Sequence, residues 1–123
     1  MGGAVATHAA ANLSDDNRLN IDGLVLENTF TSIDDMADVM FGPLAYFKKY
    51  ILTNHWNSEE TIKDVNMPIA FISGSKDELV PEGQMERLKK AAEDGFSGAS
   101  RHFYKFKEGT HNDTWFHDKA KYL

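Results

Sequence analysis

Two polar residues, Asp77 and His111, each follow a predicted strand and could together form an acid–base pair. Asp77 comes after the apolar run PIAFISGS and a glycine turn, and His111 comes after RHFYKFKE by a comparable step. If these strands are neighbours in a parallel sheet, their carboxyl ends meet at one edge, where ligands of open α/β sheets bind. The carboxylate would then hold the imidazole in one tautomer, as in Ser-His-Asp catalysis.

Both residues also have simpler structural interpretations. Asp77 could cap the helix that is predicted to begin near Pro81, and a histidine in a loop is often merely exposed. His111, Asp113 and His117 together could suggest a metal site. However, histidines at positions i and i+6 do not share a helix face. We therefore expect no metal ligand set here, and spacing alone leaves the acid–base pair and the structural interpretations open.

The elements that would position these residues alternate between helix and strand. The expected order is a helix at 2–13, a strand at 23–29 buried on both faces, helical pieces within 34–56, a short helix from Ser58, a strand at 68–75, a helix from Pro81 to Gly95, an edge strand at 101–108 with one solvated face, and a helical start after Asn112. Such alternation favours a parallel sheet covered by helices. The fold class is therefore α/β, with about three parallel strands and flanking helices.

Composition excludes several classes of function. The 123 residues carry 19 acidic and 13 basic side chains, a net charge of -6, which repels phosphate backbones and argues against a nucleic-acid partner. Cysteine is absent, so disulfides, thiol catalysis and zinc-thiolate sites are excluded. No run approaches the roughly 20 apolar residues of a membrane span. We expect a chain that is soluble as given and needs no cofactor.

Four motifs add a resemblance to a known family. SGSKDELVP looks like the acid loop of α/β-hydrolases, EGTHNDTW looks like their histidine loop, and MGGAVATHAA resembles the helix that follows their G-x-S-x-G nucleophile elbow. The order of acid before base also agrees with the family. ENTFTSIDDMA and GTHNDTW narrow the likeness to the bud-emergence type of α/β-hydrolase. The resemblance covers nearly the whole chain and corresponds to the C-terminal half of such a domain.

The resemblance implies roles for particular residues. His111 would be the general base of a serine hydrolase and Asp77 the acid that orients it. The backbone N–H of Met1 would supply part of the oxyanion hole, a role in doubt because Met1 is a free terminus here. Residues 34–56 would form cap or lid helices. The nucleophile would precede residue 1, so residues 1–123 would be a partial domain that is inactive alone.

No serine of this sequence lies in a G-x-S-x-G elbow; the serines are Ser14, Ser32, Ser58, Ser73, Ser75, Ser97 and Ser100. The alternatives are a non-catalytic pseudo-hydrolase or binding module, and a small self-contained α/β domain. If the enzyme were complete, the resemblance implies a small-molecule or lipid acyl substrate of the esterase, lipase, thioesterase or peptidase type. It implies membrane contact only through an N-terminal segment, which leaves the compartment open.

Overall fold

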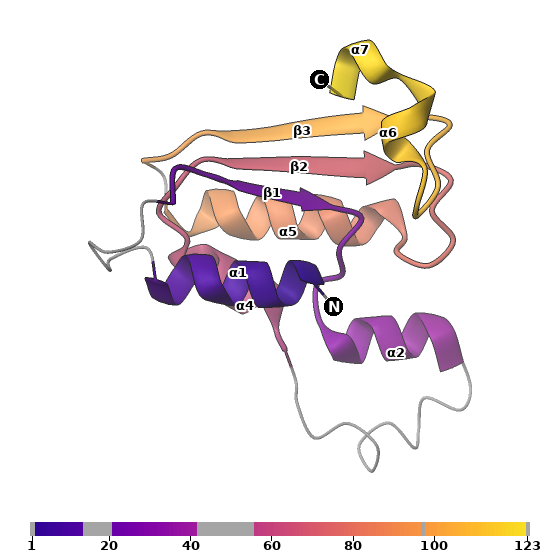
Figure 1. Cartoon of the computed structure of the whole chain (residues 1–123). Coiled ribbons are helices and arrows are strands. Elements are labelled where there is room, and N and C mark those ends of the chain that lie inside the picture. Colours follow the sequence, from indigo (N-terminus) through magenta and orange to yellow (C-terminus); the bar gives the residue numbers. More distant parts are fainter. Residues whose placement is uncertain (1, 14–20, 42–55, 97, 123) are drawn as a thin grey trace.

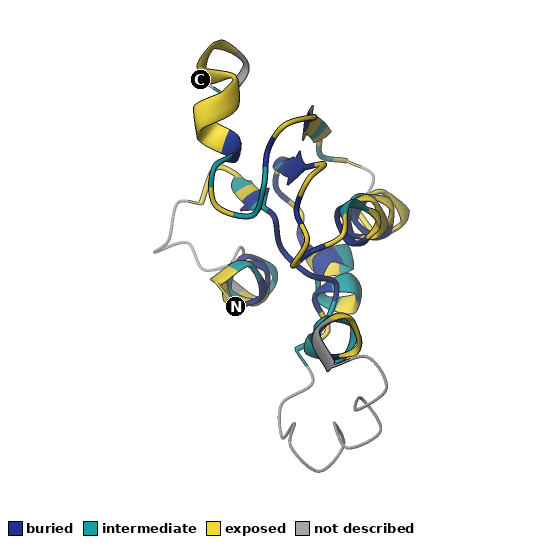
Figure 2. Cartoon of the chain, turned by 90° about the vertical axis from the view of Figure 1, so that its right-hand side faces the viewer, coloured by how far each residue is buried: buried dark blue, intermediate teal, exposed yellow. Residues whose placement is uncertain are grey.

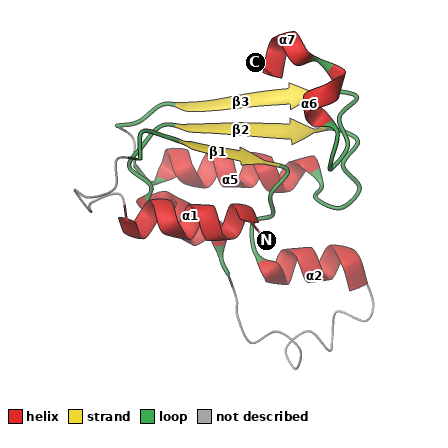
Figure 3. Ribbon diagram, in the orientation of Figure 1, coloured by secondary structure: helices red, strands yellow, loops and turns green. Residues whose placement is uncertain are grey.

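The computed structural model describes residues 2–13, 21–41, 56–96 and 98–122 (Figure 1). Helices and strands alternate along the described chain, as Figure 3 shows. The helices are α1 (Gly2–Leu13), α2 (Ile33–Phe41), α4 (Ser58–Thr61), η2 (Ile62–Asp64, a 3-10 helix), α5 (Glu82–Asp94), α6 (Thr114–His117) and α7 (Lys119–Tyr122). The strands are β1 (Leu24–Glu27), β2 (Ile69–Gly74) and β3 (Arg101–Phe106). The predicted order of elements is confirmed, while positions 42–55 of the predicted cap segment lie outside the described residues.

The three strands form one parallel sheet in the order β1-β2-β3. Leu26 pairs with Phe71, and Phe71 pairs with Phe103, so these three side chains share one face. Because all strands run the same way, their carboxyl ends lie at one edge, as the arrowheads in Figure 1 show. The predicted fold class, an α/β chain with a three-stranded parallel sheet and flanking helices, is confirmed.

The main core lies between the sheet and the helices α1, η2 and α5. Phe71 and Ile69 of β2 are fully buried against Met85 and Leu88 of α5. The spacing of the buried α5 residues, which also include Ala91 and Ala92, gives that helix one apolar stripe. In Figure 1 α1, α4 and α5 all lie on this side of the sheet. The core therefore fixes the strands from one side.

The opposite face of the sheet differs from the prediction. Strand β1 was expected to be buried on both faces, but Val25 is 64% exposed. The expectation is wrong because β1 is an edge strand, and the described helices cover the Leu26 face rather than the Val25 face. Tyr104 of β3, on the same face as Val25, is exposed as well. Figure 2 shows how buried and exposed residues are distributed over the chain.

Helix α7 covers part of the exposed face of the sheet, near the carboxyl ends of the strands. The Tyr122 hydroxyl donates to Glu27 Oε2 at 2.8 Å, and the ring packs edge-on against Phe106. The bond to Glu27 is the main reason that the pKa of Tyr122 is raised. Tyr122, the last described residue, is thus joined to the end of β1, beside the strand ends where the candidate site lies.

Candidate active site at the carboxyl edge of the sheet

Asp77 lies in the turn that follows β2, with its side chain fully buried. Its Oδ1 accepts two backbone hydrogen bonds of 2.8 Å, from Leu79 N and Val80 N. Asp77 does not cap α5, because the N-cap residue of that helix is Pro81. It binds the backbone of the turn just before the helix instead. One carboxylate oxygen closes the turn before the helix, and the other remains for a second partner.

That second partner is His111, in the loop after β3. His111 Nδ1 lies 2.8 Å from Asp77 Oδ2, and the histidine side chain is 33% exposed. Since an ionised carboxylate can only accept, Nδ1 carries the proton and donates it to this bond. In the neutral imidazole the lone pair is then on Nε2, which can take up a proton. The structure thus brings together the two residues singled out from the sequence.

His111 lines a pocket of about 310 Å³ at this edge. Phe30, Met36 and Val80 give the pocket an apolar side. Its remaining lining residues are Gly2, Gly3, Glu27, Asn28 and Thr29. The histidine therefore lies in a pocket that combines polar residues with an apolar side.

Comparison with known proteins relates the chain as a whole to α/β-hydrolases. The chain is 40% identical over 116 residues to Protein bem46 of Schizosaccharomyces pombe and 34% identical over 130 residues to the Alpha/beta hydrolase domain-containing protein WAV2 of Arabidopsis thaliana. The matches cover 93% and 94% of this chain. The chain matches a bud-emergence-type α/β-hydrolase domain. No protein-family model matches the sequence.

The chain corresponds to only part of each of these relatives. The chain spans 36% of the length of bem46 and 39% of that of WAV2. Among solved structures, it is similar to the acylaminoacyl peptidase of Pyrococcus horikoshii with a TM-score of 0.69 at 19% identity. That match covers 92% of this chain and 19% of the peptidase, and it supports the α/β-hydrolase fold.

A hydrogen-bonded turn holds the loop that carries His111. Thr110 N donates to Asp113 Oδ1 at 2.6 Å, and Thr114 Oγ1 donates to Thr110 O at 2.9 Å. The first of these bonds is the largest cause that lowers the pKa of Asp113 to about 2, and His117 adds to the effect. Asp113 is therefore ionised throughout the neutral range and braces the backbone on both sides of His111.

This brace should make the stability of the domain depend on pH. The pKa of Asp113 falls from its ordinary 3.8 to about 2 on folding. Its stabilising contribution is therefore fully present above about pH 4 and is lost as the pH falls through the folded value. We expect Asp113→Asn to unfold at lower urea concentration than the wild type at about pH 6, and the gap between the two midpoints to close towards about pH 2. A gap that is constant over this range would contradict the role of the charge.

Asn28 is a site residue that the motifs did not single out. It follows β1, is buried, and has a left-handed backbone with φ of 45°. Its side chain reaches both Gly74 at the end of β2 and the histidine loop 82 to 86 positions away. The signal in the sequence was its place in the polar cluster ENT, directly after a strand, but its partners are too distant along the chain to be deduced.

Thr29 belongs to the same polar cluster after β1, and no role was assigned to it from the sequence. Its Oγ1 is buried and has no hydrogen-bond partner among the described residues. It lies against Gly3 so closely that a Cβ at position 3 would come within 2.0 Å of it. A glycine at this position therefore lets the start of α1 approach the end of β1 and line the same pocket as His111.

Met1, the predicted contributor to an oxyanion hole, lies outside the described residues. His111, Asp113 and His117, the alternative metal ligands, do not come together in the structure. Asp113 pairs with His117 at 3.0 Å, while His111 pairs with Asp77. Within the described ranges, no group of three or more potential ligands is placed to hold a metal ion. None of the described helices is long and apolar enough to cross a membrane.

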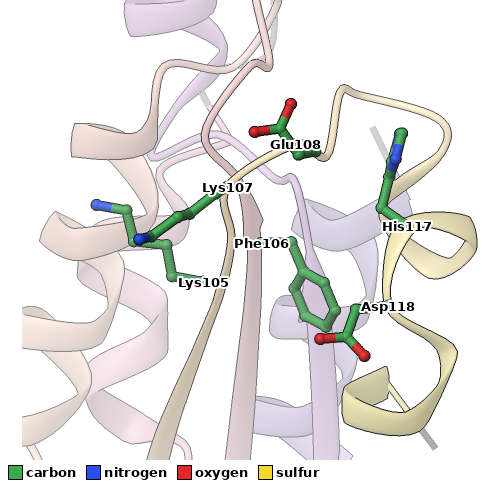
Figure 4. A pocket seen from close by; sticks show the side chains of 6 residues that line it. All are labelled: Lys105, Phe106, Lys107, Glu108, His117 and Asp118. Carbon is green, nitrogen blue, oxygen red and sulfur yellow. The ribbon is translucent and has the colours of Figure 1, made fainter.

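A second pocket, of about 290 Å³, lies beside the end of β3 and is lined by Lys105, Phe106, Lys107, Glu108, His117 and Asp118. Figure 4 shows the two lysines on one side of it and His117 and Asp118 on the other. Its charges largely have partners within the chain: Lys105 pairs with Glu82, and Glu108 pairs with Lys76. These ion pairs favour a structural interpretation of this pocket.

Proposed function

We propose that Asp77 and His111 are the acid and the base of a serine hydrolase that cleaves an ester, thioester or amide. The observation that carries the proposal is the 2.8 Å contact between His111 Nδ1 and Asp77 Oδ2. It leaves Nε2 as the basic atom of a ring that lines a pocket with both polar and apolar walls. A buried carboxylate that orients a histidine and stabilises the imidazolium is the arrangement on which Ser-His-Asp catalysis depends.

The reaction follows from the protonation states of this pair. A serine Oγ attacks the carbonyl carbon of the substrate while its proton passes to His111 Nε2. The imidazolium, stabilised by Asp77, gives this proton to the leaving group as the bond to the acyl carbon breaks. Water then repeats the sequence on the acyl-enzyme: its proton passes to Nε2, its oxygen bonds to the acyl carbon, and the serine leaves with the proton.

We further propose that the serine is not one of the seven in this sequence. None of the five serines in the described part of the chain lines the pocket of His111. Ser73 is buried in β2, and the exposed Ser75 forms a hydrogen bond with Glu82. The chain also spans little more than a third of the length of bem46 and WAV2. A segment outside these 123 residues would therefore supply the nucleophile, and the backbone N–H of Met1 would follow it as an oxyanion donor.

The substrate class that we propose is an acyl compound with an apolar acyl group. Phe30, Met36 and Val80 form the apolar side of the pocket next to the histidine. The net charge of -6 disfavours a nucleic-acid substrate. Short esters of a chromogenic alcohol are suitable probes, because the apolar side accepts the acyl group and the reaction needs no second substrate.

A fluorophosphonate serine probe tests this assignment on the chain itself. We expect the folded chain to be labelled no more than its urea-unfolded form, and to hydrolyse p-nitrophenyl butyrate no faster than a Ser75→Ala variant. Strong labelling of a serine in the folded chain, abolished in His111→Ala, would contradict the proposal that the nucleophile lies elsewhere. It would instead identify an active serine within the 123 residues.

A further inference from the structure

We propose that Asn28 is a positioning residue that sets the histidine loop against the acid turn. The inference rests on the proposed function, since it concerns how the Asp77–His111 pair is held. Asn28 lines the same pocket as His111. It is only 6% exposed, and its side-chain amide bonds to the two segments that carry the acid and the base.

Both ends of the Asn28 amide are used. Nδ2 donates towards the histidine loop, at 3.0 Å from Thr110 O, 3.1 Å from His111 O and 2.9 Å from Thr114 Oγ1. Oδ1 accepts from Gly74 N at 2.9 Å. The assignment of the amide is fixed by chemistry, because carbonyl oxygens need a donor and the Gly74 N–H needs an acceptor.

The backbone of Asn28 is anchored in the sheet. Its N–H donates to Ile72 O at 3.0 Å, which extends the pairing of β1 with β2 by one residue. The left-handed backbone, with φ of 45°, turns the chain at this point, and asparagine is among the residues that tolerate this region. The amide therefore projects from a rigid strand end.

This amide connects the acid to the base. Asp77 N donates to Gly74 O at 3.2 Å, so the acid turn is built on the same residue whose N–H Asn28 binds. The two loops also touch directly through Lys76 N and Gly109 O at 2.9 Å, but that contact stops two residues before His111. Asn28 reaches the carbonyl of His111 itself. We therefore infer that it controls the direction of the imidazole more than the stability of the sheet.

The substitution Asn28→Asp tests this directly. Aspartate keeps the shape and the acceptor for Gly74 N, but it places a second oxygen against three acceptor atoms. Asn28→Gly provides a variant without a buried charge, and glycine adopts a positive φ without strain. Asn112→Asp is the matched control, because it makes the same chemical change at an exposed position of the histidine loop.

The readout is the Nδ1 proton of His111 in the uniformly ¹⁵N-labelled chain, observed by NMR far downfield and assigned by its absence in His111→Ala. We expect Asn112→Asp to retain this resonance. We expect Asn28→Asp and Asn28→Gly to lose it, while the amide resonances of β2 and α5 stay in place. A resonance that persists in folded Asn28→Gly would overturn the positioning role and leave the proposed function intact.

The two failures can be told apart. If the wild-type chain shows no such resonance, or shows one that Asp77→Asn does not remove, the acid–base pair itself is absent in solution and the proposed function fails. If Asn28→Asp does not fold, Asn28→Gly decides the outcome. If Asn28→Gly also loses the amide resonances of β2 and α5, then Asn28 supports the sheet as a whole, and the specific positioning role is rejected.

Discussion

Replacing His111 by alanine is expected to lower the turnover of an ester about a million-fold in a completed hydrolase, because no other group of the triad can take the serine proton. A longer protein for this test can be made by joining the part of bem46 that precedes its region of similarity, which we expect to end with the nucleophile serine, to Met1 of this chain. Asp77→Asn should lower kcat about ten-thousand-fold, since the amide favours the wrong tautomer of the histidine. Hydrolysis of p-nitrophenyl butyrate measures both effects.

His117→Ala is the matched control for this experiment. His117 lies six positions further along the chain and pairs with Asp113 instead of Asp77. We expect its replacement to change kcat by less than about tenfold. His117 contacts Asp113, which stabilises the histidine loop, and it contacts no reacting atom. Equal losses in His111→Ala and His117→Ala would indicate a structural effect on the loop, and retained activity in His111→Ala would show that another residue is the base.

Replacing Gly74 by alanine should destabilise the domain by about 3 kcal/mol. A Cβ at position 74 would lie 2.4 Å from Gly109 O and 2.9 Å from Thr110 O, and these are backbone atoms that cannot rotate away. The strand end that leads to Asp77 and the loop that leads to His111 would have to separate. Urea unfolding of Gly74→Ala, followed by circular dichroism, measures the loss.

Gly83→Ala is the control for the glycine substitution. Gly83 lies in the first turn of α5, and a Cβ there meets nothing within 4 Å. Alanine should stabilise the helix by about 0.5 kcal/mol, because it loses less backbone entropy on folding. If both variants shifted the unfolding midpoint equally, the close approach of the two loops at Gly74 would not exist in solution.

The order of elements could be predicted because its signals are local. The apolar stripe of α5, with Met85 and Leu88, repeats at helical spacing, and Gly95 ends it. The apolar segment that forms β2 is preceded by Pro68 and ends at the Gly74 turn. Asp77 and His111 were candidates because each follows a strand and parallel strand ends meet at one edge. Their pairing as acid and base came from the resemblance of their loops to those of α/β-hydrolases.

Other features depend on partners that are distant in the sequence. The Asn28 amide binds residues more than 80 positions away, and nothing in the cluster ENT specifies them. Arg101 begins the strand that was expected to be solvated on one face, yet its guanidinium donates to Val65 O at 2.8 Å and Met67 O at 2.7 Å. Its burial lowers the pKa of the guanidinium. The exposure of Val25 likewise follows from which face the helices cover, and strand pattern alone does not determine this.

The rate of fluorophosphonate labelling in the completed hydrolase tests the central claim most directly. A serine supplied by the joined segment should react rapidly in the wild type, because His111 removes its proton as the phosphorus is attacked. We expect labelling to slow at least about a thousand-fold in His111→Ala and to stay near the wild-type rate in His117→Ala. Labelling at an unchanged rate in His111→Ala would contradict the assignment of Asp77 and His111 as the acid and base of the triad.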